Sequence, residues 1–188
     1  MRTLKIFLSL GIALFILGCV PSLHPLYTDK ELVFNPALVG TWLDVDDEKD
    51  TWTFRKSEEK AYKLIQYQSK GDTAEFEVHL VQLGEFLFLD TQVEGPEMIN
   101  NDFYRMHFIP GHIFSRVRLE GDNLSLAMLD PDSLKKMIEE KKADIGHELF
   151  GDDGIVLTAP TAELQKFMLK SAGDTEAFGE PMKLKRQK

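Results

Sequence analysis

Apolar and polar residues alternate with a period of two through most of the middle of the chain, between residues 39 and 130. Phe76, Val78 and Leu80, for example, are separated by charged or polar residues. A strand with this pattern buries one face of a sheet and exposes the other to water. Turn-forming residues divide the pattern into eight predicted strands, over residues 39–46, 51–56, 61–68, 73–83, 85–91, 103–109, 112–119 and 123–129.

Most of these predicted strands are joined by short loops, which is typical of antiparallel hairpins. A flat sheet of eight strands would leave two long unpaired edges, and closure into a barrel removes them. The sequence therefore predicts a mainly β fold, an antiparallel up-and-down barrel of eight strands.

The periodicity changes after this region. Asp130 and Pro131 predict the start of a helix, with Asp130 as its cap, and Thr161 is predicted to cap a second helix that ends before Gly173. A short added strand is expected between the helices, over 155–158. The last residues, 176–188, are expected to form a loose basic tail.

The first nineteen residues have a different pattern. Arg2 and Lys5 precede an apolar run, with Ser9 as its one polar residue, that ends at Gly18 and Cys19. A helix over residues 6–18 would be only about 20 Å long, whereas the hydrocarbon core of a bilayer is about 30 Å thick. This order of charged, apolar and small residues indicates a secretory signal peptide, 1–18.

The end of the apolar run, Ile16-Leu17-Gly18-Cys19, resembles the lipobox of bacterial lipoproteins. In that family the cysteine receives a diacylglycerol, the signal is removed before it, and the new amino terminus is acylated. The resemblance implies that Cys19 carries lipid and that residues 19–38 are a lipid-anchored tether. The apolar stretches 25–27 and 32–34 predict that one part of this tether docks on the folded body. Because Val20 and not aspartate follows the cysteine, it also implies the outer membrane, facing the periplasm.

Composition limits the other possibilities. Removal of the signal leaves 20 basic against 31 acidic residues, a formal net charge of −11. Such a charge argues against nucleic acid as a partner and against electrostatic adhesion to an anionic membrane. Cys19 is the only cysteine, so neither a disulfide within the chain nor thiol catalysis is expected.

Gly40-Thr41-Trp42, at the start of the first predicted strand, resembles the Gly-x-Trp signature of the lipocalin and calycin superfamily. The resemblance covers residues 39–158 and implies a calycin-like barrel domain, 39–175, with Trp42 at its closed end. It also implies an arginine stacked on this tryptophan. The last predicted strand contains no arginine, so Arg116 or Arg118 is the expected partner.

Two functions remain open. In the first, the barrel binds a small apolar ligand, such as a fatty acid or a lysolipid, in a cavity lined by strand-spaced aromatic residues. The candidates are Trp42, Trp52, Phe54, Phe76, Phe86, Phe88, Phe108 and Phe114. In the second, the barrel is filled and its surface docks another envelope protein. An open, apolar cavity would favour the first function, and a filled interior would favour the second.

Other candidate chemistry is sparse. His107 and His112 flank a Pro-Gly turn, but no third metal ligand has suitable spacing, so no metal site is predicted. The acidic turn from Asp46 to Asp50 lacks the ligand spacing of a calcium loop. No catalytic motif is recognised, and we expect neither an enzyme nor a cofactor other than the acyl groups on Cys19.

Overall fold

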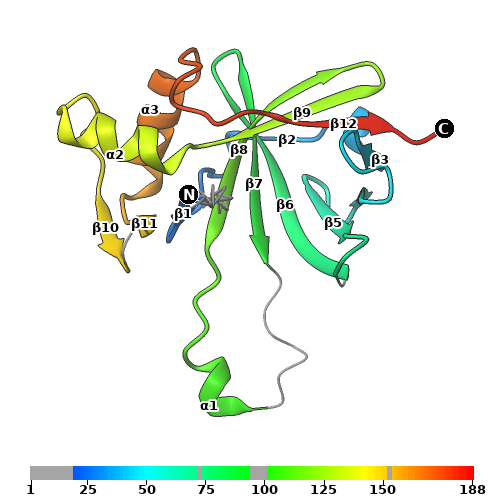
Figure 1. Cartoon of the computed structure of the whole chain (residues 1–188), viewed down its shortest axis with the longest axis horizontal. Coiled ribbons are helices and arrows are strands. Elements are labelled where there is room, and N and C mark those ends of the chain that lie inside the picture. The colour runs from blue at the N-terminus through cyan, green and yellow to red at the C-terminus, as the bar shows by residue number, and fades with distance from the viewer. Residues whose placement is uncertain (1–18, 72, 94–100, 152–153) are drawn as a thin grey trace, which may run out of the picture.

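The computed structural model describes residues 19–71, 73–93, 101–151 and 154–188, and the predicted signal peptide, 1–18, lies outside them. Antiparallel strands close into an eight-stranded barrel, so the predicted fold class is confirmed (Figure 1). The barrel strands are β3 (Gly40–Asp44), β4 (Thr51–Lys56), β5 (Ala61–Tyr67), β6 (Thr73–Leu83), β7 (Phe86–Val93), β8 (His112–Glu120), β9 (Asn123–Met128) and β12 (Met182–Arg186).

The strand predicted over residues 103–109 is wrong. This stretch holds a short helix, α1 (Asp102–Arg105), in a long connection between β7 and β8. Those two strands pair directly with each other up to Gln92 and His112, so no strand can lie between them. The exposed apolar residues Phe103, Met106 and Ile109 recur every three positions, which is not the period of a strand.

The expectation of a loose tail over residues 176–188 is also wrong. The eighth strand of the barrel is β12, which pairs with β9 on one side and with β3 on the other. Leu184 is buried in the barrel interior, while Lys183 and Lys185 on either side of it are exposed. The period of two is present in this segment, but the basic residues conceal it.

Trp42 closes one end of the barrel. Its indole Nε1 donates a hydrogen bond to the carbonyl oxygen of Leu38, 2.9 Å away, in the 3-10 helix η1 (Pro36–Leu38). The guanidinium carbon of Arg186 lies 4.2 Å from the centre of the tryptophan ring. The prediction that Arg116 or Arg118 stacks on Trp42 is therefore wrong. The strand that pairs with β3 on this side of the barrel is β12, and it places Arg186 opposite Trp42. Arg116 instead lies over the ring of Phe178.

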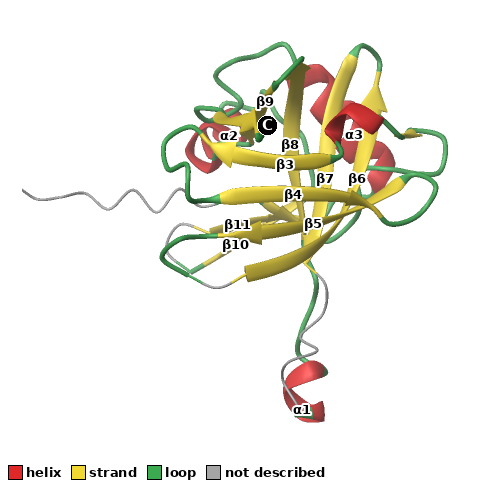
Figure 2. Cartoon of the chain, turned by 90° about the vertical axis from the view of Figure 1, so that its right-hand side faces the viewer, coloured by secondary structure: helices red, strands yellow, loops and turns green. Residues whose placement is uncertain are grey.

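A second layer covers the outside of part of the barrel wall. Beyond the end of β9, β8 pairs with β1 (Pro21–Ser22), which pairs in parallel with β11 (Gly154–Leu157), and β10 (His147–Phe150) forms the edge. The small strand β2 (Leu32–Val33) pairs with β6. Helices α2 (Pro131–Glu139) and α3 (Thr161–Ser171) lie on the outer side of the barrel strands (Figure 2). Their buried residues form one core with outward side chains of β6, β7 and β8. The chain thus has two apolar cores, separated by the barrel wall.

Both predicted helices and the added strand are present, with one difference in capping. The Oδ1 atom of Asp130 accepts a hydrogen bond from the amide of Ser133, 2.7 Å away, as expected of a cap. Pro160, and not Thr161, is the cap residue of α3. The Thr161 hydroxyl donates to the carbonyl oxygen of Pro25, so it holds the N-terminal segment instead. Among the described residues, no helix is both long and apolar enough to cross a membrane.

Candidate interaction surface

The barrel interior is filled by side chains. Trp42, Phe54, Tyr62 and Val78 have no exposed surface, and the inward leucines of the same core are at most 3% exposed, whereas Trp52 and Phe76 are partly buried at its edge. A side chain with no surface that water can touch has no water-sized space beside it. The described barrel therefore has a packed core where the sequence left open a ligand cavity.

The eight aromatic residues predicted to line a cavity do not share one site. Trp42, Trp52, Phe54 and Phe76 belong to the interior core, whereas Phe86, Phe88 and Phe114 belong to the core outside the wall. Phe108 lines a groove at the surface. The prediction of a single lining is wrong because β7 and β8 bury both faces, and alternation alone does not say which face points inward.

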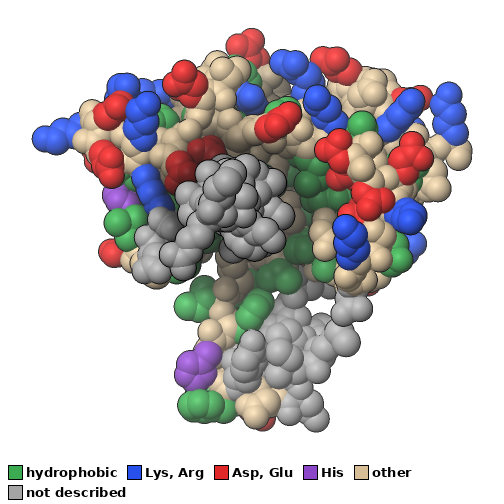
Figure 3. Space-filling view, viewed as in Figure 1, with side chains coloured by type: hydrophobic (Ala, Val, Ile, Leu, Met, Phe, Trp, Pro, Cys, Tyr) green, Lys and Arg blue, Asp and Glu red, His purple; other side chains and the backbone are tan. Residues whose placement is uncertain are grey.

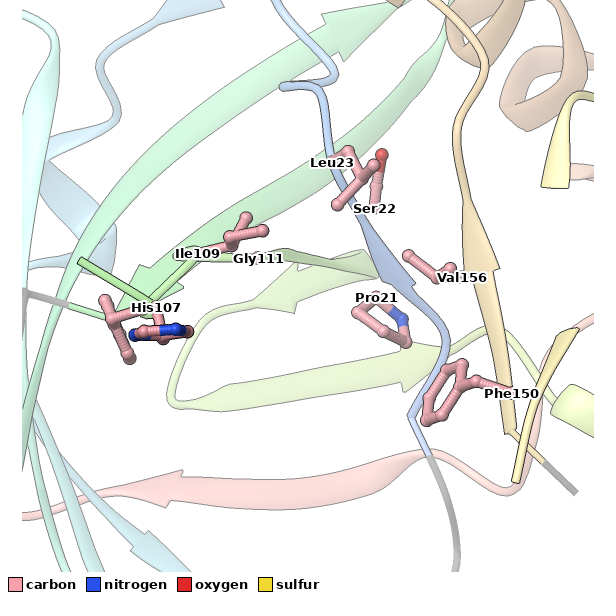
Figure 4. Close-up of a pocket in the computed structure, with 9 residues that line it drawn as sticks. Pro21, Ser22, Leu23, His107, Ile109, Gly111, Phe150 and Val156 are labelled. Carbon is pink, nitrogen blue, oxygen red and sulfur yellow. The ribbon is translucent and has the colours of Figure 1, made fainter. Parts of the chain in front are cut away.

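An open apolar groove of about 860 Å³ lies outside the barrel, between β1 with its neighbours and the base of the β7–β8 connection (Figure 4). It exists because β8 extends past the end of β9 and takes β1 as its next partner. The residues that line it are Pro21, Ser22, Leu23, His107, Phe108, Ile109, Gly111, Phe150 and Val156.

The described part of the β7–β8 connection, residues 101–111, projects from the body as an arm (Figures 1 and 2). Phe103, Met106 and Ile109 on this arm are 71%, 79% and 73% exposed. The arm is braced locally, since the His107 Nδ1 atom lies 2.6 Å from the Phe103 carbonyl oxygen. We define the outer apolar surface as the arm and groove residues Leu23, Phe103, Met106, Phe108, Ile109 and Phe150. A gathering of exposed apolar side chains of this kind marks an interaction site.

The predicted tether, residues 19–38, is docked on the body almost from its first residue. Val20, Ser22 and Leu26 are buried, and β1 begins only two residues after Cys19. Leu26 and Tyr27 pack on the core outside the barrel wall. In the second apolar part, Leu32 packs on that same core, whereas Val33 and Phe34 pack on the interior core. The Cys19 Sγ atom lies 3.5 Å from the sulfur of Met128, and burial raises the pKa of the thiol. The position of Cys19 is therefore fixed by the fold.

A buried carboxylate holds this segment in place. One oxygen of Asp90 accepts a hydrogen bond from the Leu26 amide at 2.7 Å, and the other lies 2.7 Å from Nδ1 of His112. The second ring nitrogen of His112 contacts the Gln92 side chain at 3.3 Å. On α3, Gln165 donates to the Leu26 carbonyl oxygen, so both backbone groups of Leu26 are paired.

Tyr27 covers the next part of the wall. Its ring centre lies 4.3 Å from that of His79 on β6. Burial, with the nearby charges of Asp90, Glu77 and Asp29, raises the pKa of Tyr27 to about 12. Burial also lowers the pKa of His79. Both rings are therefore uncharged at neutral pH, as an apolar contact between the segment and the barrel requires.

Replacing Asp90 by alanine is expected to release the N-terminal segment. The change leaves the Leu26 amide and the His112 Nδ1 position without their partner, and each unpaired buried donor costs about 1–3 kcal/mol. We expect lower stability in urea and faster hydrogen exchange at Leu26. Glu75→Ala is the control, because this exposed carboxylate forms a surface ion pair with Lys63 and such pairs contribute about 0–1 kcal/mol. Equal effects of the two changes would contradict this role of Asp90.

The histidines and the acidic turn that were considered as metal ligands make other contacts in the described part of the chain. Nδ1 of His107 contacts a backbone carbonyl, and Nδ1 of His112 contacts Asp90. In the acidic turn, Asp47 accepts from the Lys49 amide and Asp50 from the Ser69 amide. Hydrogen bonding from the Ser69 amide and from the Ser69 hydroxyl lowers the pKa of Asp50. Within the described ranges, no group of three or more His, Cys, Asp or Glu side chains is placed to hold a metal ion.

Comparison with known proteins adds no assignment: no protein-family model, curated protein or solved structure matches the chain. The outer apolar surface was not predicted from the sequence. In the sequence, the apolar run around Phe103 predicts a strand and gives no sign of an exposed arm.

Proposed function

We propose that this protein is a lipid-anchored lipoprotein of the cell envelope and a non-enzymatic interaction module that works through its outer apolar surface. One observation carries the proposal: the barrel interior is packed to zero exposure at Trp42 and Phe54, while large apolar side chains are exposed outside it, on the arm and around the groove that Pro21 lines. The barrel then serves as a rigid support for the surface.

The lipoprotein part of the proposal rests on the sequence Ile16 to Cys19 and on the place of Cys19 in the fold. Cys19 is exposed and lies at the point where the docked segment begins, so its thiol is reachable from outside the body. Two or more acyl chains anchor a protein stably, whereas one gives only marginal binding. Val20 supports the outer membrane, facing the periplasm, as the location.

A carrier function inside the barrel has less support. A fatty acid or lysolipid needs a cavity, and the fully buried side chains of Trp42, Phe54 and Tyr62 leave no water-sized space beside them. Opening such a space would require repacking the core around Trp42. The interaction function requires no such change, because the outer apolar surface is already exposed.

Metabolic labelling with an alkyne-tagged fatty acid tests the anchor. We expect the wild-type chain to be labelled and to fractionate with the outer membrane, and Cys19→Ala to lose the label. Met128→Leu is the matched control, since it removes the sulfur that Cys19 contacts and leaves the thiol itself. An unlabelled wild-type chain, or a label that persists in Cys19→Ala, would overturn the proposal.

A further inference from the structure

We infer that the partner of the outer apolar surface is the lipid bilayer itself, into which the arm inserts beside the anchored cysteine. The inference rests on the proposed function, because it takes the acyl groups on Cys19 as the fixed point. It adds an orientation: the body lies directly against the membrane, with the groove and the arm facing lipid.

The short distance between the anchor and the groove is the first reason. Pro21 lines the groove, and two residues of extended chain span at most about 7 Å. Val20, the residue between them, is 3% exposed and packs on the outer core. Since no flexible linker lies between Cys19 and the body, the lipid on Cys19 holds the groove at the bilayer surface.

The distribution of exposed apolar side chains is the second reason. Figure 3 shows hydrophobic side chains gathered where the arm leaves the body. Leu23 and Phe150 border the groove beside the N-terminal segment, and Phe103 and Met106 stand on the arm. Contact with water makes the exposure of these side chains unfavourable. Contact with the hydrocarbon of the nearby bilayer would remove this unfavourable free energy. Amphipathic surfaces of this kind enter the boundary between headgroups and acyl chains to a depth of about 5–10 Å.

Charge favours apolar insertion over electrostatic attraction. The chain without its predicted signal has 20 basic and 31 acidic residues, a formal net charge of −11, so an anionic lipid surface repels it. Insertion of the arm should therefore occur in vesicles of zwitterionic phosphatidylcholine and should change little with salt. A protein partner would have to displace the bilayer from a surface that the anchor already holds there.

Depth-dependent fluorescence quenching tests the inference. The protein, purified from membranes with its acyl groups, is reconstituted in phosphatidylcholine vesicles that contain doxyl-labelled lipids. An indole is introduced on the arm by Phe103→Trp, or on the exposed side of α3, away from the arm, by Leu169→Trp as the matched control. The native Trp42 and Trp52 give the same background in both variants.

We expect the F103W indole to lose most of its emission to a doxyl group near the headgroups, at low and high salt, and the L169W indole to lose little. If the two indoles are quenched equally, or if the F103W indole is shielded only after envelope proteins are added, the bilayer is not the partner. The mass of the same preparation separates the two proposals. An acylated chain without quenching overturns only the bilayer inference, whereas an unmodified Cys19 overturns the lipoprotein proposal as well.

Discussion

Removing residues 181–188 is expected to abolish the cooperative unfolding transition of the protein. This deletion takes out β12, which pairs with β3 and β9 and closes the ring, and it also removes Arg186 from the face of Trp42. The two strands left behind would have unpaired edges, and the interior core would lose Leu184. The loss should exceed the whole stability of a typical domain, about 5–15 kcal/mol. Urea unfolding followed by near-ultraviolet circular dichroism measures it.

Deletion of Lys188 alone is the control, because this residue lies beyond β12 and should leave the transition unchanged. If the longer deletion yields no soluble chain, Leu184→Ala should still cost about 2–5 kcal/mol, as large-to-small changes in a core do. Lys183→Ala, at the exposed position before it, should be nearly neutral. A folded, cooperative chain without residues 181–188 would show that the barrel does not need its eighth strand.

Replacing Trp42 by alanine is expected to cost about 3–5 kcal/mol of stability, the usual range for a buried large aromatic residue. The side chain is completely buried, donates a hydrogen bond to Leu38 and supports the guanidinium group of Arg186. Its loss therefore removes packing at the closed end and contacts to both η1 and β12. Equilibrium urea unfolding provides the value.

Trp52→Ala is the matched control. Trp52 pairs with Trp42 across strands β3 and β4 but is only partly buried, so its removal should cost less. If Trp42→Ala were no more harmful than Trp52→Ala, the interior around Trp42 would have to be loosely packed. Such a result would reopen a ligand cavity in the barrel.

The strand pattern was sufficient to predict the barrel, because most of its strands alternate clearly and are joined by short turns. The pattern led to wrong predictions in two segments, the one around Phe103 and the one between Met182 and Arg186. The run around Phe103 is apolar, and without knowledge that β7 and β8 pair directly it resembled a strand. Between Met182 and Arg186, three of five residues are basic, so a strand buried on one face resembled a frayed end. Strand pairing is decided by partners distant in sequence, and local composition does not report them.

The candidate site was less predictable than the fold. Phe88 and Phe114 carry the same spacing as inward residues, but they face outward because the helices and the N-terminal segment form a second core there. The groove arises only when β1 meets β8, and the chain separates these strands by about ninety residues. The docking of a segment near Leu26 was foreseen from its apolar residues, but the role of Asp90 as its holder required the three-dimensional structure.

Native mass spectrometry of the protein extracted from the cell envelope tests the central claim most directly. A filled barrel anchored by lipid predicts a covalent mass increase that persists on unfolding and maps to the peptide that begins at Cys19, with no second molecule that dissociates. An unmodified Cys19, together with one fatty acid or lysolipid per chain that is lost on unfolding, would contradict the account and would place the function inside the barrel.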